Sequence, residues 1–389
     1  MMDDIPAPEG HCVLAQGNAL GNVATAFFVC PVCGIMTTLL VVNSTREITM
    51  AKTPDPSRKA DAYFYQGKYA KSLEWNLKAL AFRKKELGEE HPKTATVYHN
   101  IAKVYYYQGD YATALEWFRK ALAIREKILG KEHPGTAIVY DNMALVYLWQ
   151  GEYATALEWS EKALVIREKV LGKEHPDTAH SYNSRGLIYS RQDEYAMALE
   201  WYQKDLAVSE KVRGKEHPDT AATYNNIAMV YLNQEDYAAA LEWFQKALAI
   251  DEKVLGKKHP DTANTYGNIA LVYGRQEDYV AALEWNQKAL AIREKVLGKE
   301  HPDTACSYNN IAAVYSYQED YATSLEWYLK SYKICLRKLG DAHPETSGVK
   351  DRVDAAYHLI GLNESEPFEQ WLQRMLDSDQ PPPEAETIG

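Results

Sequence analysis

A period of 42 residues runs through most of this chain and limits what the chain can fold into. The dipeptide His-Pro begins at seven positions separated by that step: 91, 133, 175, 217, 259, 301 and 343. The tripeptide Leu-Glu-Trp keeps the same step, beginning at 73, 115, 157, 199, 241, 283 and 325. Self-similarity of this kind is typical of arrays in which one small unit stacks on the next, so the chain does not need a single large core.

Each unit reads as two helices, as residues 134–172 illustrate. Pro134 suits the first turn of a helix, where its missing N–H would be unpaired in any case. Apolar residues then recur at three- and four-residue spacing as far as Tyr147, which is a helical period. The turn around Gly151 interrupts the pattern, a second helical pattern follows from Tyr153, and Gly172 ends it. A single helix pair of this kind would leave an apolar face exposed to water, so we expect the helix pairs to be stable only as a stack.

Two positions within the unit carry further information. Small residues in the first helix predict a close approach of the paired helices: Ala102, Ala144, Gly186, Ala228, Ala270 and Ala312. The turn between the two helices holds glycine in early copies and an acidic residue in later ones: Asp193, Glu235, Glu277 and Glu319. This turn must therefore accept an ordinary residue.

The residues of one copy match a known pattern. Between Ala221 and Leu248 the chain carries, at the pattern's spacing, Tyr224, Asn225, Asn226, Ile227, Ala228, Tyr231, Tyr237, Ala240, Leu241, Phe244, Ala247 and Leu248. With its linker Leu-Gly-Lys-x-His-Pro-Asp-Thr, the chain resembles tetratricopeptide repeat proteins of the kinesin light chain and nephrocystin-like subclass, over roughly Ala60 to Leu376. The resemblance implies an all-α fold, a right-handed superhelical solenoid of antiparallel helix pairs. We expect about seven repeats and a degenerate C-terminal capping unit.

These expectations divide the chain into three parts. The solenoid should span 56–376, beginning with a helix at Pro56–Gln66 and closed by a segment around Phe368–Met375. The acidic, Pro-rich tail at 377–389 should be disordered. The N-terminal segment, 1–55, is either a membrane anchor through 23–42 or a non-native extension of a product that starts at Met50.

The expected cellular location of the protein depends on which of these two interpretations of the N-terminal segment holds. The flanking charges would keep the repeats cytosolic if 23–42 spans a membrane, and otherwise we expect a cytoplasmic protein. The pair Cys30 and Cys33 lacks further ligands nearby, so we interpret it as inert.

Several classes of function are disfavoured. A net charge of −11 argues against nucleic acid as the main partner, since phosphate binding needs a basic surface. The seven histidines recur once per layer, so they cannot converge on a metal ion, and we interpret them as turn residues. No catalytic set and no cofactor motif breaks the period. We therefore expect neither an enzyme nor a cofactor-binding protein.

In tetratricopeptide arrays the first helix of each pair lines a concave groove. The resemblance maps a peptide-binding position onto Asn100, Asn142, Asn226, Asn268 and Asn310, with Ser184 breaking the row. The alternative is that these asparagines only bond neighbouring helices. Variable positions beside the row include Lys103, Tyr107, Trp149, Arg191, Arg275 and Tyr317.

These side chains predict an extended peptide partner with large apolar or aromatic residues beside acidic ones, because arginine binds carboxylates in a bidentate manner. The leading hypothesis is a scaffold or adaptor for proteins. Two alternatives are a membrane-tethered scaffold and a regulatory sensor array that acts with a separate effector enzyme.

The fourth full copy departs from the others at two positions that normally face inward. Arg185 replaces an apolar residue of the first helix, and Asp205 replaces a small residue of the second. We predict a structural ion pair between Arg185 and Asp205. The alternative is that Arg185 extends into the groove and Asp205 reaches solvent.

Overall fold

The computed structural model describes residues 56–361 and 366–377. The candidate anchor at 23–42, the Cys30 and Cys33 pair and the tail from 378 onward lie outside the described residues. Within the described ranges, no helix combines the length and the apolarity that crossing a bilayer requires.

The described residues form sixteen helices and no strand, and the helices alternate between two kinds. The first helices of the hairpins are α2 (Pro56–Tyr65), α4 (Pro92–Tyr107), α6 (Pro134–Trp149), α8 (Pro176–Arg191), α10 (Pro218–Asn233), α12 (Pro260–Arg275), α14 (Pro302–Tyr317) and α16 (Pro344–Leu359). The second helices are α3 (Tyr69–Leu87), α5 (Tyr111–Leu129), α7 (Tyr153–Val170), α9 (Tyr195–Val212), α11 (Tyr237–Val254), α13 (Tyr279–Val296), α15 (Tyr321–Leu339) and the short α17 (Phe368–Asp377). Hairpins are numbered here from one (α2 and α3) to eight (α16 and α17).

Each first helix from α4 onward begins at a His-Pro dipeptide. The histidine is the N-cap residue, because its Nδ1 accepts a hydrogen bond of 2.9–3.1 Å from the backbone N–H two residues later. The proline occupies the first helical position. The next repeated threonine, such as Thr178, donates from Oγ1 to the carbonyl of the linker glycine, here Gly172 at 2.8 Å. The histidines are turn residues as expected, and the structure adds that they cap helices.

The two helices of a hairpin pack closely where small residues were predicted. Ala102, Ala144, Ala228 and Ala312 are fully buried, as is the ring of Tyr202. Gly186 lies against that ring, and a Cβ placed on Gly186 would lie 2.6 Å from Tyr202 Cε1. The single glycine in this row therefore makes room for a large aromatic neighbour.

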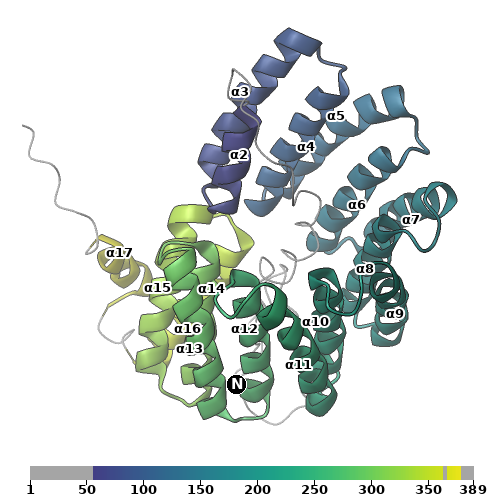
Figure 1. The fold of residues 1–389 in the computed structure, drawn as a ribbon. Coiled ribbons are helices and arrows are strands. Elements are labelled where there is room, and N and C mark those ends of the chain that lie inside the picture. The colour runs from purple at the N-terminus through teal and green to yellow at the C-terminus, as the bar shows by residue number, and fades with distance from the viewer. Residues whose placement is uncertain (1–55, 362–365, 378–389) are drawn as a thin grey trace, which may run out of the picture.

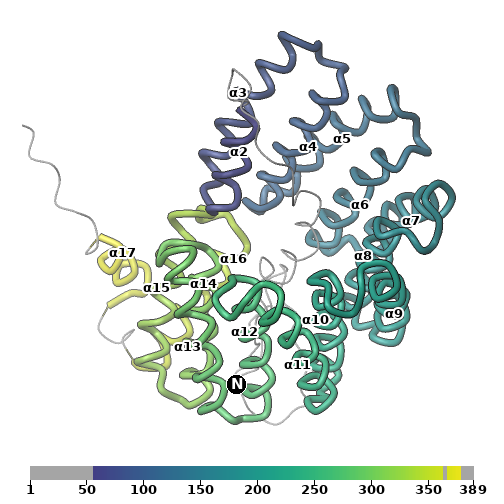
Figure 2. Tube along the Cα trace, in the orientation of Figure 1, coloured from purple at the N-terminus to yellow at the C-terminus, as the bar shows by residue number. Residues whose placement is uncertain are grey.

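The hairpins stack in one curved row, which Figure 2 follows along the chain. Neighbouring first helices contact one another, as α6 does α8 and α12 does α14, whereas neighbouring second helices make no contact of comparable extent. In a curved stack the elements on the concave side approach most closely. The first helices therefore form the inner side of the array and the second helices the outer side, an arrangement visible in Figure 1.

The row curls far enough for its two ends to meet. Figure 1 shows α2 beside the last first helices of the array. The turns at Gly67 and Gly109 contact His301-Pro302 and His343-Pro344, respectively. We call these two contacts the seam. Residues from both ends share one buried cluster here, including Tyr69 and Tyr107 from the start of the array and Ala305 and Val349 from its end.

Candidate functional site: the inner face of the first helices

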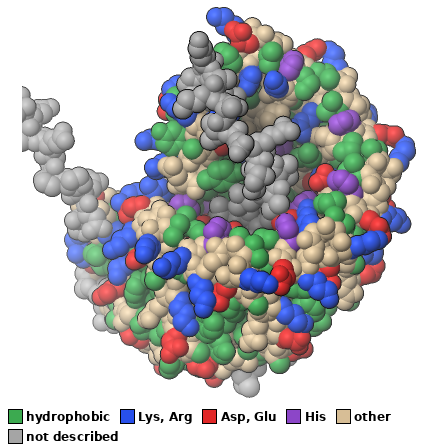
Figure 3. Space-filling model, in the orientation of Figure 1, with side chains coloured by type: hydrophobic (Ala, Val, Ile, Leu, Met, Phe, Trp, Pro, Cys, Tyr) green, Lys and Arg blue, Asp and Glu red, His purple; other side chains and the backbone are tan. Residues whose placement is uncertain are grey.

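The predicted groove residues occupy three of four repeated positions of the first helices, and we call these four positions the inner face. In α4 they are Thr96, Asn100, Lys103 and Tyr107, a spacing of four, three and four residues that keeps them on one side of a helix. The equivalent residues recur 42 positions apart in the following first helices. Figure 3 shows a hollow inside the curl of the array.

The asparagine row divides into two groups. Asn142 is buried, and its Nδ2 donates to the carbonyl of Ile138 at 2.7 Å. Asn226 donates from Nδ2 to Asn183 Oδ1 at 3.2 Å. The other three are half-buried, and no side-chain hydrogen bond forms between them and any described residue: Asn100, Asn268 and Asn310. Three amide groups of the row are thus open to a ligand, and two are engaged within the array.

The variable positions also differ in what they contact. Tyr107 is buried at the seam, where its ring lies 4.9 Å from Phe64 and 6.0 Å from Tyr69. The amine of Lys103 lies 5.1 Å from the Phe64 ring, and burial lowers the pKa of this lysine. Both residues therefore serve the first hairpins, and little of Tyr107 remains for a ligand.

The remaining variable positions lie further along the array. Trp149 is buried beneath the guanidinium of Arg191, which lies 4.3 Å from the tryptophan ring. Tyr317 stacks on Tyr279 with the ring centroids 6.3 Å apart. Arg191, Arg275 and Tyr317 are half-buried, so part of each residue remains accessible.

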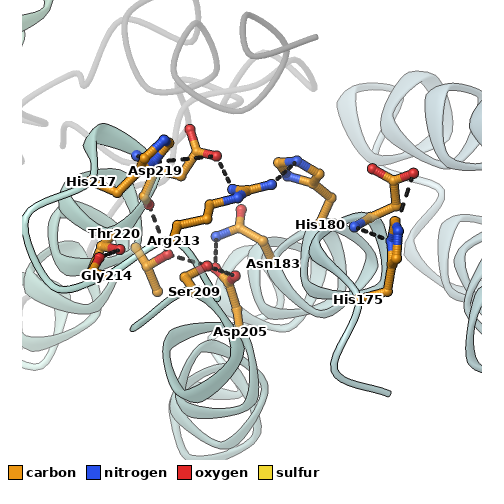
Figure 4. Close-up of polar contacts among 12 residues, drawn as sticks. His175, His180, Asn183, Asp205, Ser209, Arg213, Gly214, His217, Asp219 and Thr220 are labelled. Carbon is orange, nitrogen blue, oxygen red and sulfur yellow. Dashed lines mark hydrogen bonds and ion pairs between the residues drawn. The ribbon is translucent and has the colours of Figure 1, made fainter. Parts of the chain in front are cut away.

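A buried polar cluster lies between α8, α9 and α10 (Figure 4). Asp205 accepts hydrogen bonds from Asn183 Nδ2 at 2.8 Å, from Thr223 Oγ1 at 2.6 Å and from Ser209 Oγ at 3.1 Å. Burial raises the pKa of Asp205, and the three hydrogen bonds oppose that shift. Because Asn226 bonds to Asn183, this residue of the predicted row is tied to the cluster.

The predicted ion pair between Arg185 and Asp205 is wrong, although both residues are buried. Arg185 pairs with Glu161 of α7, and its guanidinium lies 4.5 Å from the ring of Trp201. The long arginine side chain reaches a carboxylate near the surface while its stem covers apolar area. The shorter Asp205 side chain instead finds uncharged donors within reach. The predicted pair does not describe these two residues, and neither does the alternative in which Arg185 extends into the groove and Asp205 reaches solvent.

Figure 4 also shows an ion pair, between Arg213 and Asp219, that was not predicted from the sequence. Arg213 occupies a position that is leucine in most copies, and it pairs with Asp219 at the start of α10. Its Nη2 lies 3.1 Å from Nε2 of His180 on the inner face. Burial, and then the charge of Arg213, lower the pKa of His180 to about 4. The sequence signal for this pair was Arg213 itself, which replaces the leucine that most copies carry at this position.

Sequence reasoning also missed a row of acidic residues at the N-terminal ends of the first helices: Asp177, Asp219, Asp261, Asp303 and Glu345. They follow the capping histidine by two residues, where a negative charge suits the helix dipole. Burial raises the pKa of Glu345 to about 7, and Asp303 adds to the shift. Acidic residues thus mark the starts of these first helices, and two arginines, Arg191 and Arg275, lie at the opposite helix ends.

Within residues 56–361 and 366–377, no group of three or more histidine, cysteine, aspartate or glutamate side chains is arranged to hold a metal ion. Most of the polar groups described above bond to one another or to helix ends, and Asn100, Asn268 and Asn310 do not.

Comparisons with known proteins agree with this geometry. A family model described as tetratricopeptide repeat matches seven overlapping segments that together span 56–347: residues 56–127, 100–148, 135–211, 182–253, 219–295, 261–337 and 303–347. No curated protein matches the chain.

Solved structures resemble the array at low sequence identity. The apo form of RapI is 21% identical, with 74% of this chain and 98% of that chain covered and a TM-score of 0.53. BtubC (BKLC) from P. vanneervenii is 23% identical, with coverage of 64% and 94% and a TM-score of 0.46. A Podosopora anserina putative kinesin light chain with nearly identical TPR-like repeats is 26% identical, with coverage of 52% and 99% and a TM-score of 0.42. The likeness to RapI concerns the fold alone.

Proposed function

Because the chain belongs to the tetratricopeptide repeat family, whose arrays typically mediate protein–protein interaction, we propose that it is an adaptor that holds extended peptide segments of partner proteins against its inner face. One observation carries this proposal. Asn100, Asn268 and Asn310 present half-buried amide groups to which no described residue bonds. A primary amide both donates and accepts, which suits the N–H and C=O groups of an extended peptide backbone.

The variable positions support a proposal about the side chains of the partner. Leu145, Leu187, Met229 and Leu271 form a half-buried apolar row beside the asparagines. Arg191 and Arg275 lie at the C-terminal ends of their helices, and acidic residues line the N-terminal ends. A partner with large apolar side chains would bury them on the apolar row. Its carboxylates would lie toward the arginines, because opposite charges attract.

The test compares inner amides with outer ones. Peptides are first selected from a random display library on the full-length wild-type chain, and their dissociation constants are measured. In Asn268→Ala/Asn310→Ala we expect affinity to fall about tenfold, because two hydrogen bonds each contribute about 0.5–1.5 kcal/mol. The matched control is Gln245→Ala/Gln287→Ala, which removes two exposed amides from the second helices α11 and α13.

The results separate two parts of the proposal. If the asparagine variant binds the selected peptides as tightly as the control does, the inner face is not the binding surface. If binding falls as expected but the selected peptides are rich in lysine and arginine, the surface is right and the proposed partner chemistry is wrong.

A further inference from the structure

The seam depends on two glycines that meet prolines from hairpins six places further along the array. A Cβ added to Gly67 would lie 2.8 Å from Pro302 Cδ, and one added to Gly109 would lie 2.7 Å from Pro344 Cδ. Real Cβ atoms do not approach other atoms this closely, and in both cases the neighbour is part of a rigid ring. The two turns can therefore touch the far end of the array only if they carry no side chain.

The equivalent turn of the last hairpin supplies a comparison. Gly361 has a φ of 76°, close to the 73° of Gly109, but a Cβ added there would meet no atom of the described residues within 4 Å. The backbone shape of the turn is thus the same with and without a proline opposite it. What distinguishes Gly109 is the contact across the seam.

His343, beside Pro344, joins the seam as a neutral group. Nδ1 of His343 accepts a hydrogen bond from the N–H of Glu345, so the ring of the neutral side chain carries its proton on Nε2. A hydrogen bond to the backbone of Tyr107, across the seam, acts to raise the pKa of His343, but burial outweighs it and lowers this pKa to about 4. His343 therefore caps its own helix, and its ring also lies against Gly109 at the opposite end of the array.

Helices pack less extensively across the seam than between consecutive hairpins. Consecutive hairpins pack along whole helices, whereas the helices that meet across the seam touch only near their ends. Local opening begins where the fewest contacts must be broken. The seam is therefore expected to open before any pair of consecutive hairpins separates.

We propose that the seam is a gate, and that its opening admits a segment that lies between two folded domains of a partner. This inference rests on the proposal that the inner face binds peptides. A free chain end can enter a closed ring by threading. A segment with a folded domain on each side cannot thread, so it reaches the inner face only when the ring opens.

The first experiment tests closure, by small-angle X-ray scattering on the full-length chain. Gly109→Glu places at the seam the residue that later copies carry at this turn, and Gly361→Glu is the matched control. We expect a larger radius of gyration for Gly109→Glu, wild-type values for the control and the same helix content by circular dichroism. If Gly109→Glu does not fold, Pro344→Ala removes the opposing ring and leaves every turn unchanged. A folded seam variant with the wild-type radius of gyration would overturn the proposal.

The second experiment tests the gate by labelling a thiol introduced on the inner face with Asn268→Cys. The two probes are N-ethylmaleimide and a maleimide attached to a small folded protein, with labelling of the unmodified chain subtracted. We expect the protein-borne probe to react slowly, and Gly109→Glu to raise its rate relative to N-ethylmaleimide by about tenfold, as a shift in a two-state opening equilibrium allows. An unchanged ratio would refute the gate. Since neither experiment uses a peptide, failure of peptide binding in the asparagine variant would be recognised separately.

Discussion

The turns of the first two hairpins and those of hairpins four to seven have the same backbone shape but different residues. Gly67 and Gly109 have φ values of 64° and 73°. The later turns place Asp193, Glu235, Glu277 and Glu319 at φ of 60–63°, in the left-handed region that side chains disfavour. The backbone shape alone therefore does not require glycine. At the first two hairpins glycine is required because a proline ring lies across the seam.

The same two regions also differ in how hairpins are joined. At the seam, proline rings fit against bare backbone. In the middle of the array, buried charged side chains connect successive hairpins, as Arg167 of α7 does by pairing with Asp141 of α6 and bonding to Ser181 of α8 at 2.7 Å. The seam depends on shape and the middle depends on satisfied charge, so the two should respond to different substitutions.

The largest expected effect is in the middle of the array. Arg167→Leu leaves the carboxylate of Asp141 buried without its cation, and such losses typically cost about 3–5 kcal/mol. Hydrogen exchange should then become faster in α6, α7 and α8 while the helices at the seam keep their protection. Native-state hydrogen exchange measured helix by helix checks this, because repeat arrays open locally.

A second substitution tests whether the unpaired buried charge causes this loss of protection. Replacing both partners, in Arg167→Leu/Asp141→Leu, removes the stranded charge and should restore most of the protection. If the double variant is as unprotected as the single one, the loss comes from packing and the contrast between seam and middle fails.

A smaller effect, dependent on pH, is expected at Asp251. Burial raises the pKa of this carboxyl to about 7, against the hydrogen bond it accepts from Thr265. A group whose pKa is raised by folding stabilises the protein fully only below its ordinary pKa, and this stability is lost as the pH rises through the folded value. Asp251→Asn keeps an acceptor for Thr265 and removes the charge. It should be more stable than wild type by about 2–4 kcal/mol at pH 8 and by almost nothing at pH 4.

Denaturation by urea between pH 4 and pH 8 measures this difference. Asp320→Asn is a control for charge alone, because Asp320 is an exposed helix cap whose pKa is lowered rather than raised. An Asp251→Asn curve parallel to that of wild type across this range would show that Asp251 does not titrate as burial predicts.

The fold could be predicted because it is a property that all copies share. The His-Pro step, the helical spacing and the small residues at Ala144 and its equivalents each recur in register, so errors at one copy are corrected by the others. The cap role of the histidines was missed, since the usual N-cap residues are serine, threonine, aspartate and asparagine.

The site could be predicted only in part, because it depends on where copies differ. The row of asparagines stays a prediction as a binding site. The recurrence of asparagine in the sequence also does not show that Asn226 bonds to Asn183 whereas Asn268 has no partner among the described residues. Arg185 pairs with a residue of the preceding hairpin, and the length of its side chain decides which carboxylate it reaches. Comparing positions within a single copy of the repeat could not reveal this partner. The seam joins residues 234 positions apart, such as Gly109 and His343, and no feature of the 42-residue period indicates how far the row curls.

The smallest effect concerns the turns themselves. Glu235 has a φ of 63°, and a left-handed backbone conformation costs a residue with a side chain about 1–2 kcal/mol. Glycine avoids this cost, but it loses more conformational entropy on folding, which offsets part of the gain. Glu235→Gly should therefore stabilise hairpin five by about 0.5–1 kcal/mol, measured by hydrogen exchange in α10 and α11. The reverse change, Gly361→Glu, should cost a similar amount at the other end of the array. Gly109→Glu should cost more than Gly361→Glu, since it meets Pro344 as well as the strained backbone. If the two reverse changes cost the same, the glycine at the seam is explained by backbone shape after all.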